Sequence, residues 1–130
     1  MKFSILFFLT TLITLSLNNS FAKDANPIVE WAPFDVKEGI TEAQLIAASN
    51  RLQLEFLSKQ KGYIKRSLLK GKGSQWVDII HWESIGDAHE ALNQAASCVV
   101  CAEFFALLVM TDPTNASEGI FHYEQIQSWQ

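Results

Sequence analysis

Hydrophobic and polar positions alternate along residues 75–83, "QWVDIIHWE", as they do in a β-strand, yet both faces of this segment carry large apolar side chains. Three further segments have strand-like composition and are bounded by turn residues. Two others repeat apolar residues at the three- and four-residue spacing of a helix. The predicted strands are 28–36, 63–69, 75–83 and 120–129, and the predicted helices are 41–61 and 84–96, with a further helical segment at 98–110.

Capping residues mark where these helices begin and end. Thr41 with Gln44, and Ser84 with Asp87, each match a capping box, in which side chains satisfy free backbone donors of the first turn. Gly62 can adopt the left-handed conformation that ends a helix. The helices therefore have defined positions between the strands.

The order of elements is strand, helix, strand, strand, helix, strand. This order is typical of a ferredoxin-like βαββαβ fold of the α+β class, with a four-stranded antiparallel sheet. Its two crossovers are right-handed and place both helices on one face of the sheet. We expect the strand order 4-1-3-2.

The first 22 residues resemble a secretory signal peptide. Lys2 precedes an uncharged apolar run, and Ser20 and Ala22 place small residues before a cleavage site after Ala22. The run is short for a membrane span, although an uncleaved anchor is the alternative. We therefore expect a periplasmic or secreted protein whose single domain is residues 23–130, with no membrane association after cleavage.

The charge of the chain argues against nucleic acid as a partner. The net charge is −4, and it becomes −5 without Lys2. The segment "KGKGS" at 70–74 carries only two lysines and reads as a hairpin turn, so no basic cluster is present that could follow a phosphate backbone.

The face of the sheet that the helices leave open should be unusually apolar. In the third strand, Trp76, Asp78, Ile80 and Trp82 point to one face, and Val77, Ile79 and His81 point to the other. The first and last strands also place large apolar side chains on both of their faces. Apolar patches of this size seldom stay exposed in a monomer. We therefore expect a homodimer in which two sheets face each other and enclose a cavity for a small apolar or aromatic molecule.

The pattern "KEGITEAQL … KQKGYIKRSLL … WVDIIHWESIGDAHEAL … FF" resembles the dimeric α/β-barrel superfamily, and within it the antibiotic-biosynthesis-monooxygenase-like (ABM) domains. The resemblance covers nearly all of 28–127 and is strongest at "HWESIGDAHEAL". It implies the fold firmly and the function weakly, because one fold hosts many activities. Members of the superfamily include cofactor-independent oxygenases of aromatic substrates, haem-degrading enzymes, decarboxylases and proteins without known activity.

Two histidines are the candidate acid–base groups. His81 and His122 lie in the third and fourth predicted strands and have reference pKa values near neutrality. The alternative is that each is a strand histidine satisfied by a backbone carbonyl. The sequence does not establish that they share a face of the sheet.

A second group of residues is predicted to bind the ligand. Asp78 could orient it together with Arg66, or the two could form a structural ion pair across neighbouring strands. Trp76, Trp82 and Tyr123 could form aromatic walls, or they could be plain core or dimer interface.

Cys98 and Cys101 form the segment "SCVVC". If Ser97 caps a new helix, Cys98 lies in its first turn, where the helix dipole lowers the pKa of a thiol and favours redox chemistry. The alternatives are two buried thiols or a local disulfide. Two cysteines alone are too few for a structural zinc site, and a zinc ion shared with histidines or across a dimer is a remote alternative.

A haem cofactor is not expected. The haem-degrading relatives carry a histidine ligand on the second helix, whereas the only histidine there, His89, falls in its first turns and is expected to face water. We therefore predict no cofactor and no metal.

Three functions remain. The first is cofactor-independent oxygenation of an aromatic or quinol-like substrate, with His81 or His122 as the base. The second is a non-catalytic periplasmic ligand-binding or stress protein that uses the same cavity. The third is a thiol-redox protein that uses Cys98 and Cys101.

Overall fold

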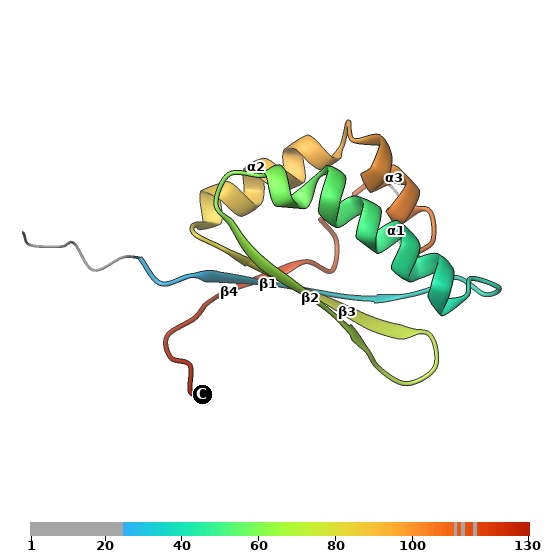
Figure 1. Ribbon diagram of the computed structural model, residues 1–130, viewed down its shortest axis with the longest axis horizontal. Coiled ribbons are helices and arrows are strands. Elements are labelled where there is room, and N and C mark those ends of the chain that lie inside the picture. Colours follow the sequence, from blue (N-terminus) through green and yellow to red (C-terminus); the bar gives the residue numbers. More distant parts are fainter. Residues whose placement is uncertain (1–24, 111, 113, 116) are drawn as a thin grey trace, which may run out of the picture.

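The computed structural model describes residues 25–110, 112, 114, 115 and 117–130, so the predicted signal peptide lies outside the described residues. These described residues form four strands and three α-helices in the predicted order (Figure 1). The elements are β1 (Ile28–Asp35), α1 (Glu42–Glu55), a short 3₁₀ helix η1 (Leu57–Lys59), β2 (Tyr63–Lys70), β3 (Gln75–Trp82), α2 (Ile85–Ala95), α3 (Val99–Phe105) and β4 (Phe121–Glu124).

The sheet is antiparallel with the strand order β2-β3-β1-β4, which confirms the predicted arrangement. All three α-helices lie on one face of this sheet, and the C-terminal segment runs along the other side (Figure 1). The α+β, ferredoxin-like fold class is therefore confirmed.

The last strand is much shorter than predicted, because its partner β1 begins at Ile28. β4 pairs with β1 only from Ile28 to Trp31, with Glu124 opposite Ile28. Beyond this end, Gln125 N donates to Pro27 O at 2.9 Å, and the predicted extension to residue 129 has no strand to pair with among the described residues. At the other end of the same edge, the segment after α3 pairs with β1, with Val109 N donating to Asp35 O at 2.8 Å and an isolated bridge joining Val36 to Leu108.

The first helix ends earlier than predicted. α1 stops at Glu55, and a turn of 3₁₀ helix then brings Leu57 into the core, where its exposed fraction is 5%. Gly62 does have the expected left-handed backbone, with φ of 72°, but it shapes the turn into β2 and packs against Asp87. The Thr41–Gln44 capping box is present as predicted.

The helix after the break is capped by a cysteine and not by the predicted serine. Cys98 is the N-cap residue of α3, and its sulfur accepts a hydrogen bond from Cys101 N at 3.2 Å. α3 ends at Phe105, five residues before the predicted end. The chain then turns so that the segment around Leu108 can join the edge of β1.

Residues of β1 and β3 alternate between the two faces of the sheet. The face under the helices carries the buried side chains Trp76, Asp78, Ile80 and Trp82 of β3, and Glu30 pairs with Ile80 on this side. These residues pack with the apolar sides of the helices, including Leu45, Leu52, Ala88, Ala91 and Phe104, to form the core. The core therefore lies between the sheet and the helices.

The opposite face keeps large apolar side chains in the open, as predicted. Trp31 stands opposite Ile79 on one side and Phe121 on the other, and Val29 stands opposite Tyr123. Trp31, Phe121 and Tyr123 are 38%, 50% and 57% exposed. We call the side of the sheet that carries these residues the open face.

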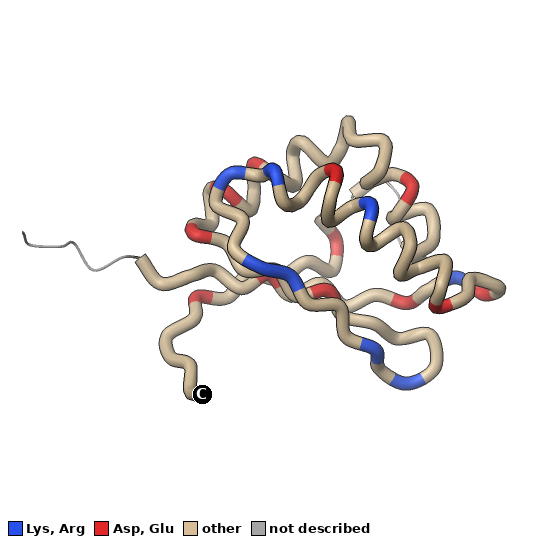
Figure 2. The backbone as a smooth tube through the Cα atoms, viewed as in Figure 1, with Lys and Arg blue, Asp and Glu red and all other residues tan. Residues whose placement is uncertain are grey.

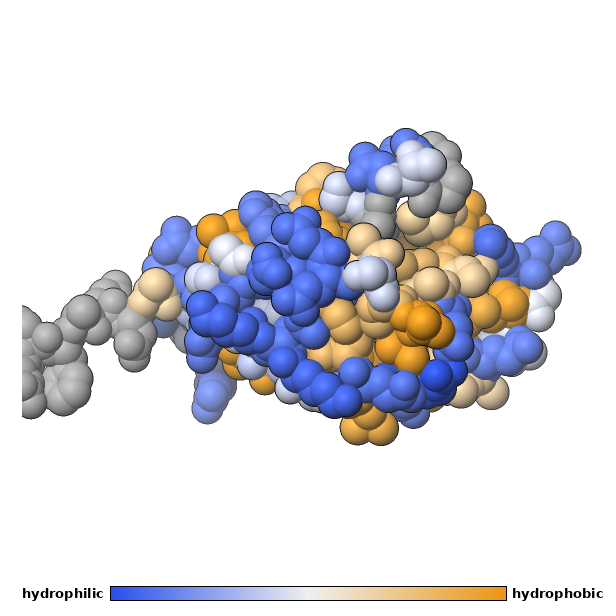
Figure 3. All heavy atoms as spheres, turned by 90° about the horizontal axis from the view of Figure 1, so that it is seen from above, coloured by the Kyte–Doolittle hydropathy of each residue, from blue (hydrophilic) through white to orange (hydrophobic). Residues whose placement is uncertain are grey.

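Apolar surface is not confined to the open face. Figure 3 views the molecule from the helix side and shows an apolar area at its centre, bordered by polar side chains. Exposed apolar residues of the helices include Ile46, Leu54 and Val99. None of the helices in the described ranges combines the length and the apolar character needed to cross a membrane.

Charged residues are mixed over the surface. Figure 2 shows lysines and arginines near the end of α1, on β2 and in the β2–β3 turn, with acidic residues between them. This spread agrees with the sequence-based prediction that nucleic acid is not a partner, which stays a prediction.

Candidate functional site

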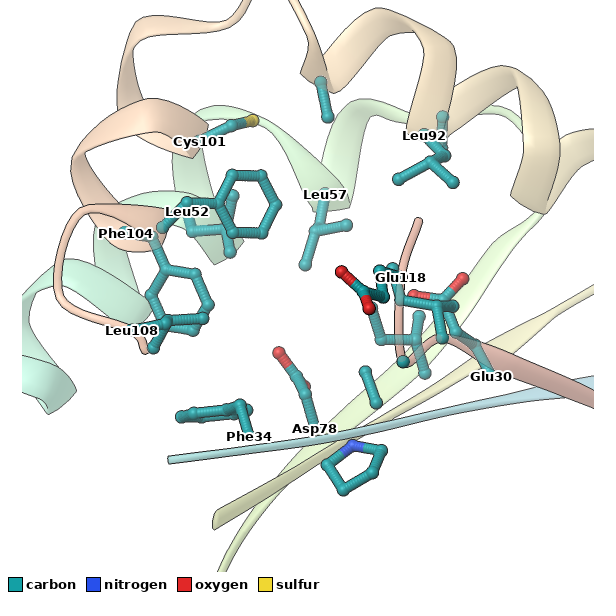
Figure 4. A pocket seen from close by; sticks show the side chains of 18 of the residues that line it. Glu30, Phe34, Leu52, Leu57, Asp78, Leu92, Cys101, Phe104, Leu108 and Glu118 are labelled. Atoms are coloured by element: carbon teal, nitrogen blue, oxygen red, sulfur yellow. The ribbon is translucent and has the colours of Figure 1, made fainter. Parts of the chain in front are cut away.

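A cavity of about 510 Å³ lies between the sheet and the helices of a single chain. Figure 4 shows Phe104, Leu108 and Cys101 on one side of it, and Leu92, Glu30 and Glu118 on the other. Its wall is largely apolar, and it reaches the surface where the exposed residues Val109 and Glu118 contribute to it. A cavity of this size and character suits a small apolar or aromatic molecule.

This cavity lies elsewhere than the binding chamber that we predicted between two chains. We expected the ligand between the sheets of two copies, on the face away from the helices. The large cavity of the chain lies instead on the helix side, because the small side chains Ala32, Ala88, Ala91 and Ala95 leave space between the layers. A chamber between two facing sheets stays a prediction.

Asp78 lies in the wall of the cavity, but its carboxylate is fully engaged by Arg66. The Nε and Nη2 atoms of Arg66 donate to the two carboxylate oxygens at 2.7 and 2.6 Å. The Nη1 atom donates to the carbonyl oxygen of Ser49 at 3.0 Å, and the guanidinium lies 5.5 Å from the centre of the Phe104 ring. This geometry is the structural ion pair that we considered for Arg66 and Asp78.

The second buried carboxylate of the cavity, Glu30, has no such cation. Its Oε2 atom accepts hydrogen bonds from Trp82 Nε1 at 3.2 Å and pairs with His122 Nε2 at 3.0 Å. The side chain of Glu30 is only 10% exposed. Burial raises the pKa of Glu30 above its usual 4.5; the contacts with His122 and Trp82 oppose this shift, and the charge of Asp78 adds to it.

One oxygen of Glu30 is left for a ligand. No fully buried side-chain oxygen or nitrogen of the described residues lacks a hydrogen-bond partner. Glu30 Oε1 makes no hydrogen bond within the described chain, so it keeps some accessible surface, and Glu30 is one of the residues that line the cavity. Figure 4 shows Glu30 rising from the sheet toward the helices at the edge of the cavity.

The sequence analysis missed Glu30. The signal was present, because Glu30 falls at an alternate position between Ile28 and Ala32, inside the apolar set of β1. An acid in such a set must be buried with partners or with an altered pKa. Its partner His122 stands directly opposite in β4.

The two predicted histidines lie on opposite faces of the sheet. His122 is beneath the helices, whereas His81 pairs with Val29 on the open face. Burial, with a contribution from the charge of Lys65, lowers the pKa of His81. His81 therefore does not line this cavity, and its predicted role as a base in a chamber between two sheets stays a prediction.

His89 of α2 is exposed, as predicted, and its ring meets that of His122. The two ring centres are 5.3 Å apart in an edge-to-face arrangement. His89 does not line the cavity. No group of three or more metal-ligating side chains occurs in the described part of the chain.

The three aromatic residues predicted as walls have different positions. Trp82 is almost fully buried and lines the cavity. Trp76 is buried on the same side of the sheet, but it lines a second cavity of about 280 Å³ near Lys70, whose ammonium lies 5.6 Å from the centre of its ring. Tyr123 is exposed on the open face and does not line this cavity, so its role as a wall of a chamber between two sheets stays a prediction.

Cys98 and Cys101 form a disulfide, with their Cα atoms 5.2 Å apart. This outcome excludes the alternative of two separate buried thiols. Cys101 has no exposed surface and lines the cavity, whereas Cys98 is half-buried. The disulfide therefore fixes the start of α3 against the cavity wall.

No protein-family model matches the chain, and no curated protein sequence matches it. Among solved structures, the cofactor-independent oxygenase SnoaB from Streptomyces nogalater is similar with a TM-score of 0.62 and 18% identity, over 80% of this chain and 97% of that one. The monooxygenase from the gene ActVA-Orf6 of Streptomyces coelicolor, solved with the ligand nanaomycin D, is similar with a TM-score of 0.59 and 13% identity, over 82% and 93%.

A haem-degrading protein from Mycobacterium tuberculosis is similar with a TM-score of 0.50 and 15% identity, over 80% of this chain and 99% of that one. Identities this low establish the fold alone. The fold of the chain is thus that of the ABM structures, which confirms the fold that the sequence resemblance implied.

Proposed function

We propose that the protein binds a small aromatic molecule in the cavity between its sheet and its helices and oxidises it with molecular oxygen, without a cofactor. The observation that carries this proposal is an apolar cavity of about 510 Å³ whose buried acid Glu30 keeps one carboxylate oxygen, Oε1, unbonded within the described chain. The similar structures of SnoaB, a cofactor-independent oxygenase, and of the ActVA-Orf6 monooxygenase support it.

The proposed reaction converts an activated CH₂ group of a hydroxylated aromatic ring system into a ketone. One atom of O₂ enters the product, the other leaves as water, and the substrate itself supplies the electrons. The chain contributes a dry, apolar space that holds the substrate, and a base that makes it electron-rich by removing a proton.

The other predicted residues that lie at or near this cavity shape its wall or hold Glu30 in place. Arg66 and Asp78 are engaged with each other, so they provide a rigid wall beside the ligand. Trp82 supplies an aromatic wall and holds Glu30. His122 reaches the ligand only through Glu30.

Oxygen uptake tests the proposal. The purified mature protein is incubated with a panel of hydroxylated anthrones, such as 1,8-dihydroxyanthrone, which carry an activated CH₂ group, and oxygen consumption is compared with a protein-free control. We expect saturable uptake with one oxygen per oxidised substrate. Tight binding of these compounds without any uptake would favour a non-catalytic ligand-binding or stress protein and would contradict the oxygenase.

We also propose that two chains pair through their open faces. The exposed aromatic residues Trp31, Phe121 and Tyr123 support this, since burying each of them is worth roughly 1.5–3 kcal/mol. The ABM fold supports it as well. Sedimentation velocity of the mature protein is expected to show a dimer at micromolar concentration, and a stable monomer there would contradict the pairing.

Export is the remaining proposal. The first 22 residues support it, and so does the disulfide between Cys98 and Cys101, because disulfides persist in oxidising compartments. Expression of the full chain in a bacterium, followed by N-terminal sequencing of the periplasmic fraction, is expected to show cleavage after Ala22.

The same pair of cysteines is the basis of the thiol-redox alternative. It predicts a disulfide that is readily reduced and reactive toward thiols. Titration of free thiols against defined glutathione mixtures tests it, and a disulfide that resists reduction would exclude it.

A further inference from the structure

We infer that Glu30 is the base of this site, with its Oε1 atom accepting the proton from the hydroxyl group of a bound phenol or quinol, and that His122 positions Glu30 for this step. The inference rests on the proposed function for its biological meaning. Its geometry, however, can be tested without turnover.

The carboxylate of Glu30 is held through only one of its two oxygens. Both hydrogen bonds go to Oε2, one from Trp82 of β3 and one with His122 of β4, so the group is fixed from the two strands that flank its own. The Oε1 atom remains at the cavity wall. A base that is fixed on one side and open on the other meets the first requirement of proton transfer, which is position.

The other acids of the cavity wall do not meet this requirement. Both oxygens of Asp78 are occupied by Arg66. Asp35 is exposed, and its Oδ1 accepts a hydrogen bond from Ser74 at 2.7 Å. Glu118 is also exposed, at the place where the cavity meets the surface. Glu30 is thus the acid of the wall that combines burial with an oxygen not bonded within the described chain.

The proton transfer is balanced within the complex. The O–H bond of the ligand breaks, its electron pair stays on the ligand oxygen, and the proton binds to Oε1. The products are a neutral carboxyl group and a phenolate. Because burial disfavours the charged form of Glu30, the apolar cavity makes Glu30 a stronger base than an exposed carboxylate. The phenolate is electron-rich and therefore readily oxidised by O₂.

Several ionisable groups surround Glu30 and shape its pH dependence. His122 contacts it from β4, and Asp78 acts on it from β3. Glu118 lies on the same side of the cavity in Figure 4, and His89 of α2 stands behind His122. The contact with His122 lowers the pKa of Glu30, so losing this contact raises it.

Turnover gives the first test. With 1,8-dihydroxyanthrone as substrate, Glu30→Gln is expected to lower kcat by roughly 10²–10⁴-fold, because a positioned base contributes about that much. Gln keeps an oxygen for Trp82 and His122, so the fold should be preserved, and circular dichroism checks this. The matched control is Glu83→Gln, an exposed acid outside the cavity, with kcat unchanged within twofold. Full activity of the Glu30→Gln enzyme would overturn the inference.

Binding of 4-nitrophenol gives the second test, which does not require turnover. Its visible absorbance distinguishes the phenol from the phenolate. At a pH below the pKa of free nitrophenol, a larger fraction of the bound probe is expected to be phenolate in the wild-type protein than in Glu30→Gln. Equal spectra in the two proteins would overturn the inference. If the spectra differ but no substrate is oxidised, the oxygenase fails while the role of Glu30 stands.

The positioning role of His122 has its own readout. His122→Gln is expected to keep part of the activity and to move the acidic limb of the pH profile of kcat/KM to higher pH. If the limb stays in place, His122 has no influence on the base. If Glu30→Gln fails to fold, the pH dependence of nitrophenol binding to wild-type and His122→Gln proteins still tests both residues.

Discussion

Two carboxylates, Glu30 and Asp78, line the same cavity and are almost equally buried, with exposed fractions of 8% and 6%. Asp78 is neutralised by a bidentate contact with Arg66. Glu30 has instead a tryptophan and a histidine, both on one of its oxygens. Burial is thus the same at both places, and the partners differ.

Because of this difference, Asp78 has a structural role, whereas Glu30 keeps an oxygen that can react with a ligand. A buried carboxylate with a full set of partners has nothing left to offer a ligand, and its ion pair fixes β2 to β3. A buried carboxylate with one unbonded oxygen keeps part of its desolvation cost, which appears as a raised pKa. Four substitutions test the comparison, from the largest expected effect on stability to the smallest.

The largest effect is expected from Arg66→Met. Removing the cation leaves the charge of Asp78 buried without compensation, which should cost about 3–5 kcal/mol of unfolding free energy. Urea denaturation of the mature protein measures this. The double variant Arg66→Met with Asp78→Leu should recover most of the loss, and a double variant as unstable as the single one would contradict the ion-pair explanation.

A smaller loss is expected from Trp82→Phe. This change keeps an aromatic ring but removes the donor to Glu30, and losing a hydrogen bond to a buried acid costs about 1–3 kcal/mol. The pKa of Glu30 should rise further, because the tryptophan contact lowers it. Urea denaturation measures the first effect, and the acidic limb of the pH profile measures the second.

The effect of Glu30→Gln on stability should depend on pH. The folded protein holds the proton of Glu30 more tightly than the unfolded chain does, so wild-type stability falls as the pH rises from 4.5 through the raised pKa of Glu30. Gln has no proton to lose. The melting temperature of Glu30→Gln, relative to wild type, is therefore expected to be higher at pH 8 than at pH 4. A difference that does not vary with pH would contradict the raised pKa.

The smallest effect is expected from His81→Ala. His81 lies on the open face, away from both carboxylates, so oxygen uptake and nitrophenol binding should match those of wild type. Its effect on unfolding should stay near 0.5 kcal/mol, as for an ordinary surface position. A loss of turnover comparable to that of Glu30→Gln would mean that a second site exists on the open face.

Much of the fold follows from the sequence because its signals are local. Period-two and helical patterns, together with capping residues such as Thr41 and Ser84, define six elements and their order. The end of the last strand could not be read in this way. It depends on where β1 begins, because Ile28 pairs with Glu124 and the sheet offers no partner beyond it, and this pairing is a contact between distant parts of the chain.

The site was predictable only in part, for a similar reason. The pairing of Arg66 with Asp78 follows from their places on neighbouring strands. Which face of β3 carries the helices does not follow, because both faces are apolar, so the sequence could not show that His81 and Tyr123 lie on the other side of the sheet from Glu30 and His122. Glu30 escaped notice because its role depends on His122, 92 residues later in the chain.

The four-stranded sheet stands as a partition between the cavity and the open face. Two chains joined back to back would therefore carry their binding chambers on the outer sides of a double layer, each complete by itself. Saturation of such a pair should follow a simple hyperbola with one ligand per chain. Any cooperativity would have to pass through two layers of hydrogen-bonded backbone.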